Sequence, residues 1–224
     1  MRRWVFGLPP PPPPLAQGPR LEVDKRYTAQ LVYDIAREMD SWSYAWDEMM
    51  LMAAAFQYHR PSLVVDIGTQ NGRSARIWYE LSIRLGIPAE IHTIDLADPK
   101  HPQYVGKDQG EFVRGLPVVQ HIGDGFTVAG DILRGRPAAT ALVYLDSDHS
   151  YENVRRELQL VSLIREGCVL VHDTFYQPEP TYDRGVYRAI EDSLPDLNVG
   201  QVIHLQIGRP GMSYLRVGKV EKRP

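Results

Sequence analysis

The sequence predicts an α/β fold with a doubly wound sheet of seven mostly parallel strands, an antiparallel last strand and helices in front of the sheet. Two observations predict this class. From residue 63 onward, short runs that are nearly continuously apolar alternate with helical patterns, as expected for strands buried on both faces. The last two runs, residues 201–207 and 213–217, are separated by a Gly- and Pro-containing turn, which predicts a hairpin.

The chain opens with a proline-rich segment. Residues 9–14 are six consecutive prolines, and proline fixes an extended backbone and lacks an N–H group. We therefore predict that residues 1–20 are a disordered proline-rich leader. The alternative is a ligand for a proline-recognising module.

Residues 21–60 are predicted to be a helical preface to the sheet. Leu31, Ile35 and Met39 recur at every fourth position. A second apolar stripe is formed by Met49, Met50, Met52, Ala53 and Phe56. Between the stripes, residues 41–46 contain two tryptophans and a tyrosine, which predict either ordinary packing or a lid over a ligand.

Residues 61–219 are predicted to be a single ligand-binding domain that contains the whole sheet. Helices between its strands imply right-handed crossovers. The first five strands are expected at residues 63–68, 91–95, 118–123, 141–146 and 168–173, with helices from the first strand to about 85 and at 151–165 and 183–193. No residues remain for a separate substrate domain. The substrate pocket must therefore be shaped by the preface, by a second subunit or by the segment after the fifth strand, which includes Tyr182, Asp183 and Arg184.

The composition excludes several classes of protein. A chain of 224 residues is long enough for one domain with an appendage, and its net charge of −3 makes nucleic acid a poor partner. No apolar run approaches the length of a membrane span. The single cysteine, Cys168, permits neither an internal disulfide nor a paired-cysteine metal motif, and it fits a cytoplasmic protein.

Polar residues at the strand ends carry the first chemical signal, because parallel sheets bind ligands beyond the carboxyl ends of their strands. The first strand ends in Asp66 and Gly68, and Gly72 follows before the next helix. This spacing is not the dinucleotide motif, and no phosphate-binding lysine follows it. Asp95 ends the second strand, where a carboxylate can accept hydrogen bonds from two ribose hydroxyls.

These residues resemble the class I S-adenosylmethionine-dependent methyltransferases, which have a Rossmann-like fold. By this resemblance Asp66, Gly68 and Gly72 would surround the methionine part of the cofactor, Asp95 the ribose and Asp124 the adenine. The complete predicted cofactor-binding set is Asp66, Gly68, Thr69, Asn71, Gly72, Ser74, Asp95, Gly123, Asp124 and Asp146. The alternatives are that Asp66 and Asp124 cap helices, that Asp95 is a turn residue and that the glycines only form turns.

The ends of the fourth and fifth strands carry a second signal. Asp146 and Asp173 end neighbouring strands and are expected to converge, which suits Mg²⁺ or another divalent cation. Such an ion lowers the pKa of a bound hydroxyl, and Asp148 or His149 is placed to accept its proton. The alternative is that the acids cap helices and the histidines only bond to carboxylates.

This second pattern resembles a narrower group: the cephalosporin-hydroxylase-like proteins and metal-dependent sugar O-methyltransferases, of the methyltransferase domain family 24 type. The resemblance implies Asp146 and Asp173 as metal ligands and Asp148 as general base. His172 stands where those enzymes have an acid, and histidine suits softer ions than Mg²⁺. The predicted metal set is therefore Asp146, His172 and Asp173, and the predicted catalytic set is Asp148, His149 and His172.

The function predicted from these signals is S-adenosylmethionine-dependent methylation of a hydroxyl oxygen on a small-molecule acceptor, assisted by a divalent metal. A homo-oligomer is compatible with this reading. One alternative is a domain that binds the cofactor but has lost its chemistry, since His172 replaces an acid. The other is an NAD(P)-dependent oxidoreductase, which the missing dinucleotide motif and the terminal hairpin both disfavour.

Overall fold

The structure is a computed structural model that describes residues 21, 23–39, 44–96, 108–175, 185–207 and 210–218. The leader predicted at residues 1–20 lies outside these ranges, as do Trp42 of the lid segment and Tyr182, Asp183 and Arg184. Among the described residues, no helix has both the length and the apolar character needed to span a bilayer.

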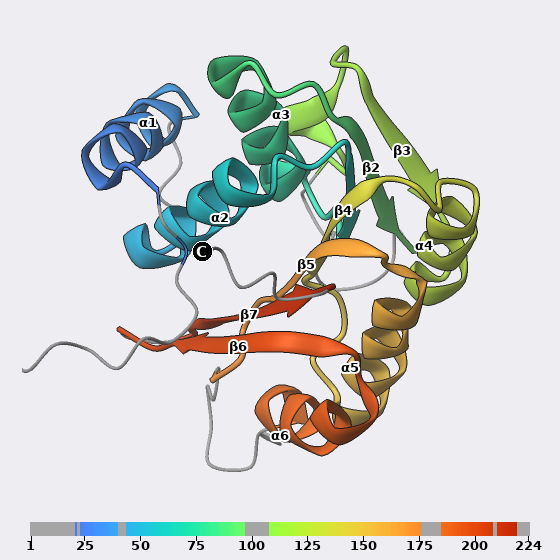
Figure 1. The fold of residues 1–224 in the computed structure, drawn as a ribbon. Coiled ribbons are helices and arrows are strands. Elements are labelled where there is room, and N and C mark those ends of the chain that lie inside the picture. The colour runs from blue at the N-terminus through green and yellow to red at the C-terminus, as the bar shows by residue number, and fades with distance from the viewer. Residues whose placement is uncertain are drawn as a thin grey trace, which may run out of the picture.

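Seven strands form one sheet in the order β3-β2-β1-β4-β5-β7-β6 (Figure 1). They are β1 Leu63–Ile67, β2 Glu90–Asp95, β3 Val118–Ile122, β4 Thr140–Leu145, β5 Glu166–Val171, β6 Val199–Leu205 and β7 Met212–Val217. The first five pair in parallel, and β7 runs antiparallel to both of its neighbours, β5 and β6. The predicted doubly wound sheet with a reversed last strand is confirmed.

Helices cover both faces of this sheet, α1 to α3 on one side and α4 to α6 on the other (Figure 1). The α-helices are α1 Lys25–Glu38, α2 Trp46–His59, α3 Arg73–Leu85, α4 Gly125–Arg134, α5 Tyr151–Glu157 and α6 Gly185–Ser193. Short 3-10 helices are η2 Glu111–Val113, η3 Leu158–Leu163 and η4 Leu194–Asp196. Successive strand residues point to opposite faces, so each central strand contributes to two separate apolar cores.

The first core joins the N-terminal helices to the sheet. Val64, Leu142 and Tyr144 of the central strands pack there with Phe56 of α2 and Trp78 of α3, all fully buried. Val65 and Val143, which alternate with these strand residues, belong to the second core beneath α4, α5 and α6. The N-terminal helices therefore complete the domain core, and α2 is held over the strands whose ends carry the acidic residues.

Two expectations about the elements need correction. Strand β3 is not buried on both faces, because it lies at the edge of the sheet, and Val119 and Ile122 are exposed. The helix expected at residues 151–165 is an α-helix only to Glu157 and continues as η3 to Leu163.

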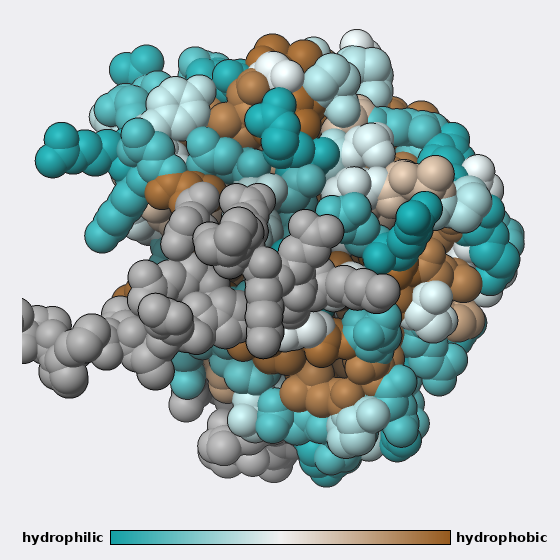
Figure 2. Space-filling view, viewed as in Figure 1, coloured by the Kyte–Doolittle hydropathy of each residue, from teal (hydrophilic) through white to brown (hydrophobic). Residues whose placement is uncertain are grey.

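On the face shown in Figure 2, hydrophilic residues predominate and the hydrophobic ones lie in separate groups.

Candidate functional site

The loop after β1 is pressed against the end of β4, at the point where the strand order reverses. Gly68 has a φ of 108°, and a Cβ atom there would lie 2.0 Å from the backbone oxygen of Asp146. Only glycine fits this contact, because any side chain would collide with the neighbouring backbone. The Gly68 N–H donates to the Ile94 carbonyl at 2.9 Å, so the same loop is also fixed to the end of β2.

Asp66 is fully buried at the end of β1, beneath this loop. Its Oδ2 atom accepts hydrogen bonds from Ser74 Oγ at 2.9 Å and Thr93 Oγ1 at 3.0 Å. Its Oδ1 atom is buried and has no hydrogen-bond partner among the described residues. Burial raises the pKa of Asp66 to about 7. Asp66 does not cap α3, whose N-cap is Gly72.

Asp95, at the end of β2, holds the middle of the same loop. Its carboxylate accepts the Gln70 N–H at 2.7 Å and the Leu96 N–H at 2.8 Å. Gln70 has a φ of 45°, a left-handed conformation that the Asp95 bond stabilises. Asp95 therefore ties the end of β2 to the loop after β1.

The other predicted cofactor residues divide into two groups. Thr69, Asn71 and Ser74 are buried in or beside the loop, and Thr69 Oγ1 bonds Thr93 Oγ1 at 2.6 Å. Asp124 instead caps α4 through the Thr127 N–H at 2.9 Å and pairs with both terminal nitrogens of Arg156. These contacts match the helix-cap alternative for Asp124. Gly123 connects β3 to this cap, and its N–H donates to the Asp95 carbonyl.

Asp146, His149 and Asp173 form a cluster beyond the ends of β4 and β5. Each can offer one ligand atom, and these atoms all lie within 4.8 Å of one another. His149 Nδ1 lies 3.1 Å from Asp173 Oδ2, and His149 Nε2 lies 3.6 Å from Asp146 Oδ1. Nε2 is buried and makes no hydrogen bond to a described residue. Carboxylates and imidazoles are ligand types that divalent cations take in proteins.

The charges in this cluster shift one another's titration. Burial alone would raise the pKa of Asp146, but His172 and His149 lower it to about 2. Burial alone would lower the pKa of His149, but Asp146 and Asp173 beside its ring raise it above the ordinary value. The ionised Asp146 carboxylate therefore attracts positive charge to the cluster.

His172 is next to the cluster but faces carboxylates on both sides. Its Nδ1 atom lies 3.2 Å from Asp146 Oδ1 and 3.1 Å from Asp173 Oδ1, and its Nε2 atom lies 3.2 Å from Glu48 Oε2. Burial opposes the charged ring, but Asp146, Asp173 and Glu48 raise the pKa of His172 well above its ordinary value. Each ring nitrogen of His172 therefore lies against at least one carboxylate oxygen.

Asp148 is placed apart from the cluster. Its side chain is exposed, and its two oxygens accept hydrogen bonds from the Ser150 N–H at 3.0 Å and Ser150 Oγ at 2.9 Å. Asp173, by contrast, adopts a left-handed φ of 51°, unusual for a residue other than glycine, and its side chain reaches both histidines. Of the three residues predicted to be catalytic, only His149 belongs to the cluster that the structure brings together.

Glu48 and Tyr44 are parts of the site that the sequence did not identify as site residues. Glu48, in the first turn of α2, is buried and also accepts the Gly211 N–H at 2.9 Å and the Ala45 N–H at 3.2 Å. Tyr44 donates its hydroxyl to Asp146 Oδ2 at 3.3 Å, and its ring packs edge-on against His172. Tyr44 falls in the predicted lid segment, whereas Glu48 looked like an ordinary acid at a helix start.

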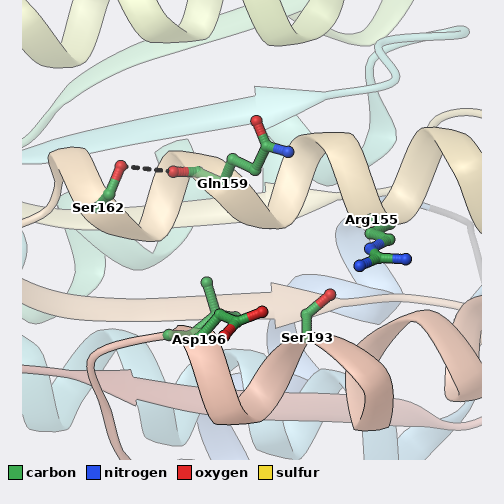
Figure 3. A pocket seen from close by; sticks show the side chains of 6 residues that line it. Arg155, Gln159, Ser162, Ser193 and Asp196 are labelled. Carbon is green, nitrogen blue, oxygen red and sulfur yellow. Dashed lines mark hydrogen bonds between the residues drawn. The ribbon is translucent and has the colours of Figure 1, made fainter.

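A separate cavity of about 360 Å³ lies between two helical segments on the second face of the sheet. Figure 3 shows Arg155, Gln159 and Ser162 of α5 and η3 facing Ser193 and Asp196 of α6 and η4. The Ser162 hydroxyl donates to the Gln159 carbonyl within this cavity. None of the predicted site residues lines it.

Comparisons with known proteins place the chain among the methyltransferases. The family model described as Rhamnosyl O-methyltransferase/CmcI matches residues 38–194, and no curated protein matches the chain. The S-adenosylhomocysteine-bound methyltransferase PaMTH1 of Podospora anserina is similar in structure, with a TM-score of 0.55, 17% identity and 87% of each chain covered.

Two further solved structures share the fold. The O-methyltransferase TomG of Streptomyces achromogenes, involved in tomaymycin synthesis and bound to S-adenosylmethionine, has a TM-score of 0.55 and 16% identity, covering 88% of this chain and 92% of that one. The calicheamicin methyltransferase CalS11 has a TM-score of 0.51 and 15% identity, covering 91% of this chain and 99% of that one.

Proposed function

Since this chain belongs to the rhamnosyl O-methyltransferase/CmcI family, we propose that its two groups of strand-end residues are the two halves of one methyl-transfer site. The protein is an S-adenosylmethionine-dependent O-methyltransferase that acts on a small molecule. The family match therefore disfavours the oxidoreductase alternative. One half of the site would hold the cofactor, and the other half would hold the acceptor.

The cofactor half consists of the loop after β1 and the acids on either side of it. Asp66 would support from beneath the loop that receives the methionine part, and Asp95 would accept the ribose hydroxyls. The main support for this proposal is that Gly68 lets the loop lie directly against the backbone of Asp146. The cofactor loop and the acceptor cluster are therefore in contact. A methyl sulfonium held at this loop lies next to the cluster, as in-line displacement requires.

The acceptor half is the cluster of Asp146, His149 and Asp173. These residues would hold a divalent cation, which when bound supplies a positive charge that acidifies a coordinated hydroxyl. Tyr44 orients Asp146 through its hydroxyl, and His172 neutralises part of the negative charge behind the cluster. Glu48 of α2 contacts His172 and so joins that helix to this half of the site.

The acceptor proton has one well-placed receiver within this half. His172 faces carboxylates with both ring nitrogens, and Asp148 is exposed and bonded to Ser150. His149 Nε2 alone is buried, makes no hydrogen bond to a described residue and borders the cluster. This nitrogen can take the proton of the acceptor hydroxyl, or it can bind a cation that acidifies the hydroxyl instead.

The acceptor class we propose is a hydroxylated small molecule of the sugar or natural-product type. The family description names a rhamnosyl O-methyltransferase, and the similar TomG and CalS11 structures are described by tomaymycin synthesis and calicheamicin. A net charge of −3 gives no attraction to nucleic acid, and the single buried cysteine fits the cytoplasm.

Calorimetric titration of the full chain tests this function. We expect S-adenosylmethionine and S-adenosylhomocysteine to bind and NADH not to bind. Asp95→Ala should weaken cofactor binding by about tenfold or more, because a charged acceptor for the ribose is lost. Asp131→Ala, which removes an exposed acid of α4, should bind the cofactor like the wild-type chain.

Turnover is then measured by transfer of a labelled methyl group to a panel of hydroxylated sugars and natural products. Product labelled at oxygen is the expected result. Failure of the wild-type protein to bind S-adenosylmethionine would contradict the proposed function. Cofactor binding without turnover on any acceptor would support the alternative that the domain has lost its chemistry.

A further inference from the structure

We propose that Glu90, His92 and His121 form a latch that holds the edge strand β3 against β2 while both histidines are neutral and releases it as they take up protons. The three residues belong to β2 and β3, and β1 lies between these strands and β4 in the sheet. Such a latch makes the opening of β3 depend on pH, independently of which reaction the protein catalyses.

The two histidines form a cross-strand pair. His92 is 4% exposed and lies opposite Val119 in the parallel register, whereas His121 is half-buried and lies opposite Ile94. Their rings stack with a centroid distance of 5.1 Å and an interplanar angle of 23°. His92 Nδ1 and His121 Nε2 are 2.8 Å apart, so one N–H···N hydrogen bond joins the two strands through these side chains.

Glu90 fixes which nitrogen of His92 carries the proton. Its Oε1 atom lies 2.9 Å from His92 Nε2, and an ionised carboxylate only accepts hydrogen bonds, so Nε2 donates. In the neutral ring Nδ1 is then the acceptor, and His121 donates its Nε2 proton to it. The bond between the strands therefore has one defined direction.

Arg136, in the loop between α4 and β4, completes the charges around the pair. It donates to both carboxylate oxygens of Glu90 and lowers the pKa of that carboxyl group. Among the described residues, Glu90 and Arg136 are the charged groups that face the two rings from the elements packed against them. The Arg136 charge opposes any further positive charge on His121.

The closed pair accepts added protons poorly. A first proton on the rings enters at the outer Nδ1 atom of His121, and a second would put an N–H on His92 Nδ1, directly against the N–H of His121. Burial lowers the pKa of His121, and His92 and Arg136 lower it further. In an open strand both rings titrate near the ordinary histidine pKa of about 6.5. The open form therefore binds more protons, and falling pH favours it.

The latch lies beside the proposed cofactor half. Gly123, which follows β3, donates its N–H to the Asp95 carbonyl at 2.9 Å, and Asp95 is the residue that we propose for the ribose. Opening of β3 removes this hydrogen bond, so the affinity for S-adenosylmethionine should fall as the latch is protonated. This consequence alone rests on the proposed function.

Hydrogen exchange of the full chain at pH 7.5 and pH 5.5 tests the latch, after correction for the intrinsic dependence of exchange on pH. We expect the protection of residues 118–122 to fall about tenfold at pH 5.5, relative to that of residues 140–145. His121→Gln should remove most of this fall, because its amide can donate to His92 but does not titrate. His204→Gln, on the opposite edge strand β6, should respond to pH like the wild-type chain.

The histidine tautomers provide a test on the wild-type chain, which does not depend on the folding of any variant. Two-bond nitrogen–proton correlation spectra at pH 7.5 should show the Nε2–H form for both His92 and His121. A proton on His92 Nδ1 at this pH would overturn the latch, as would a wild-type β3 whose protection is the same at both pH values. An equal loss of protection in the wild-type chain and in His121→Gln would also overturn it.

Calorimetric titration with S-adenosylmethionine at the same two pH values tests the link to the cofactor. We expect the wild-type chain to lose about tenfold in affinity at pH 5.5 and His121→Gln to lose clearly less. Equal losses would overturn the link between the latch and the cofactor. No binding at either pH would contradict the proposed function, whereas exchange and the tautomers would still decide the latch.

Discussion

At the scale of single residues, Glu157 is a buried carboxyl group that the proposed reaction does not use. It is only 3% exposed, and its Oε1 atom accepts the Ser147 hydroxyl at 2.8 Å. Burial raises the pKa of Glu157 to about 7, and the carboxylates of Asp124 and Asp148 add to the rise. Between about pH 4.5 and 7 the unfolded chain therefore loses a proton that the folded chain keeps.

Glu157→Gln should stabilise the protein more at pH 8 than at pH 5. A raised carboxyl pKa makes the free energy of unfolding fall as pH increases through this interval, by about 1–3 kcal/mol. Glutamine keeps an acceptor for Ser147 but cannot ionise. Urea unfolding at both pH values measures the effect, with the exposed Glu152→Gln as control. An equal change in stability at pH 5 and pH 8 would show that Glu157 titrates normally.

Some residues of the candidate site could be predicted from the sequence, and the surroundings of others could not. Asp66 and Asp95 were predicted as cofactor residues, and each lies at the end of its strand beside the loop after β1. Their roles in binding the cofactor remain predictions. Asp124 follows the same sequence pattern, yet its carboxylate is engaged by Thr127 and Arg156. The difference comes from Arg156, which lies 32 positions away and joins Asp124 only when α4 and α5 pack together.

At the scale of elements, α2 is fastened to the acceptor half through one charged residue. Glu48 is 1% exposed and contacts His172 of the loop after β5 and Gly211 of the hairpin loop. A buried carboxylate that accepts three hydrogen bonds connects the N-terminal helices to two distant segments. The preface therefore forms part of the site, as the lack of a separate substrate domain suggested.

Glu48→Gln should destabilise the protein by about 2–4 kcal/mol, because it leaves His172 without one of its buried charged partners. Glu38→Gln, which breaks a surface pair with Arg84, should cost less than about 1 kcal/mol. Thermal and urea unfolding compare the two variants. If both lose the same stability, the buried contact of α2 does not anchor that helix.

At the scale of the whole molecule, two cores on opposite faces of one sheet share its central strands. Strands β1, β4 and β5 are almost wholly buried, whereas β3 forms an edge and is largely exposed. The N-terminal helices close the first core, and α4, α5 and α6 close the second. Opening a central strand would disrupt both cores at once, whereas opening the edge strand breaks one ladder.

Hydrogen exchange should follow this arrangement. We expect the amides of β4 and β5 to exchange at least about tenfold more slowly than those of β3, because local opening releases the edge first. Mass spectrometry of peptides covering residues 140–145, 166–171 and 118–122 measures the rates at neutral pH. Equal protection of β3 and β4 would mean that the edge opens only when the whole sheet unfolds.

The sequence by itself determined the parts of this protein that depend on local pattern. Alternating apolar runs and helical stretches specify the parallel sheet, and the short turn before residue 213 specifies the reversed last strand. Because parallel strands end at one edge, the strand-end acids had to gather there. Tertiary structure alone decided that β3 is an edge and that Asp148 turns away. It also brought Glu48 to His172 across 124 positions. Such contacts depend on how separate elements pack, and no local pattern encodes that.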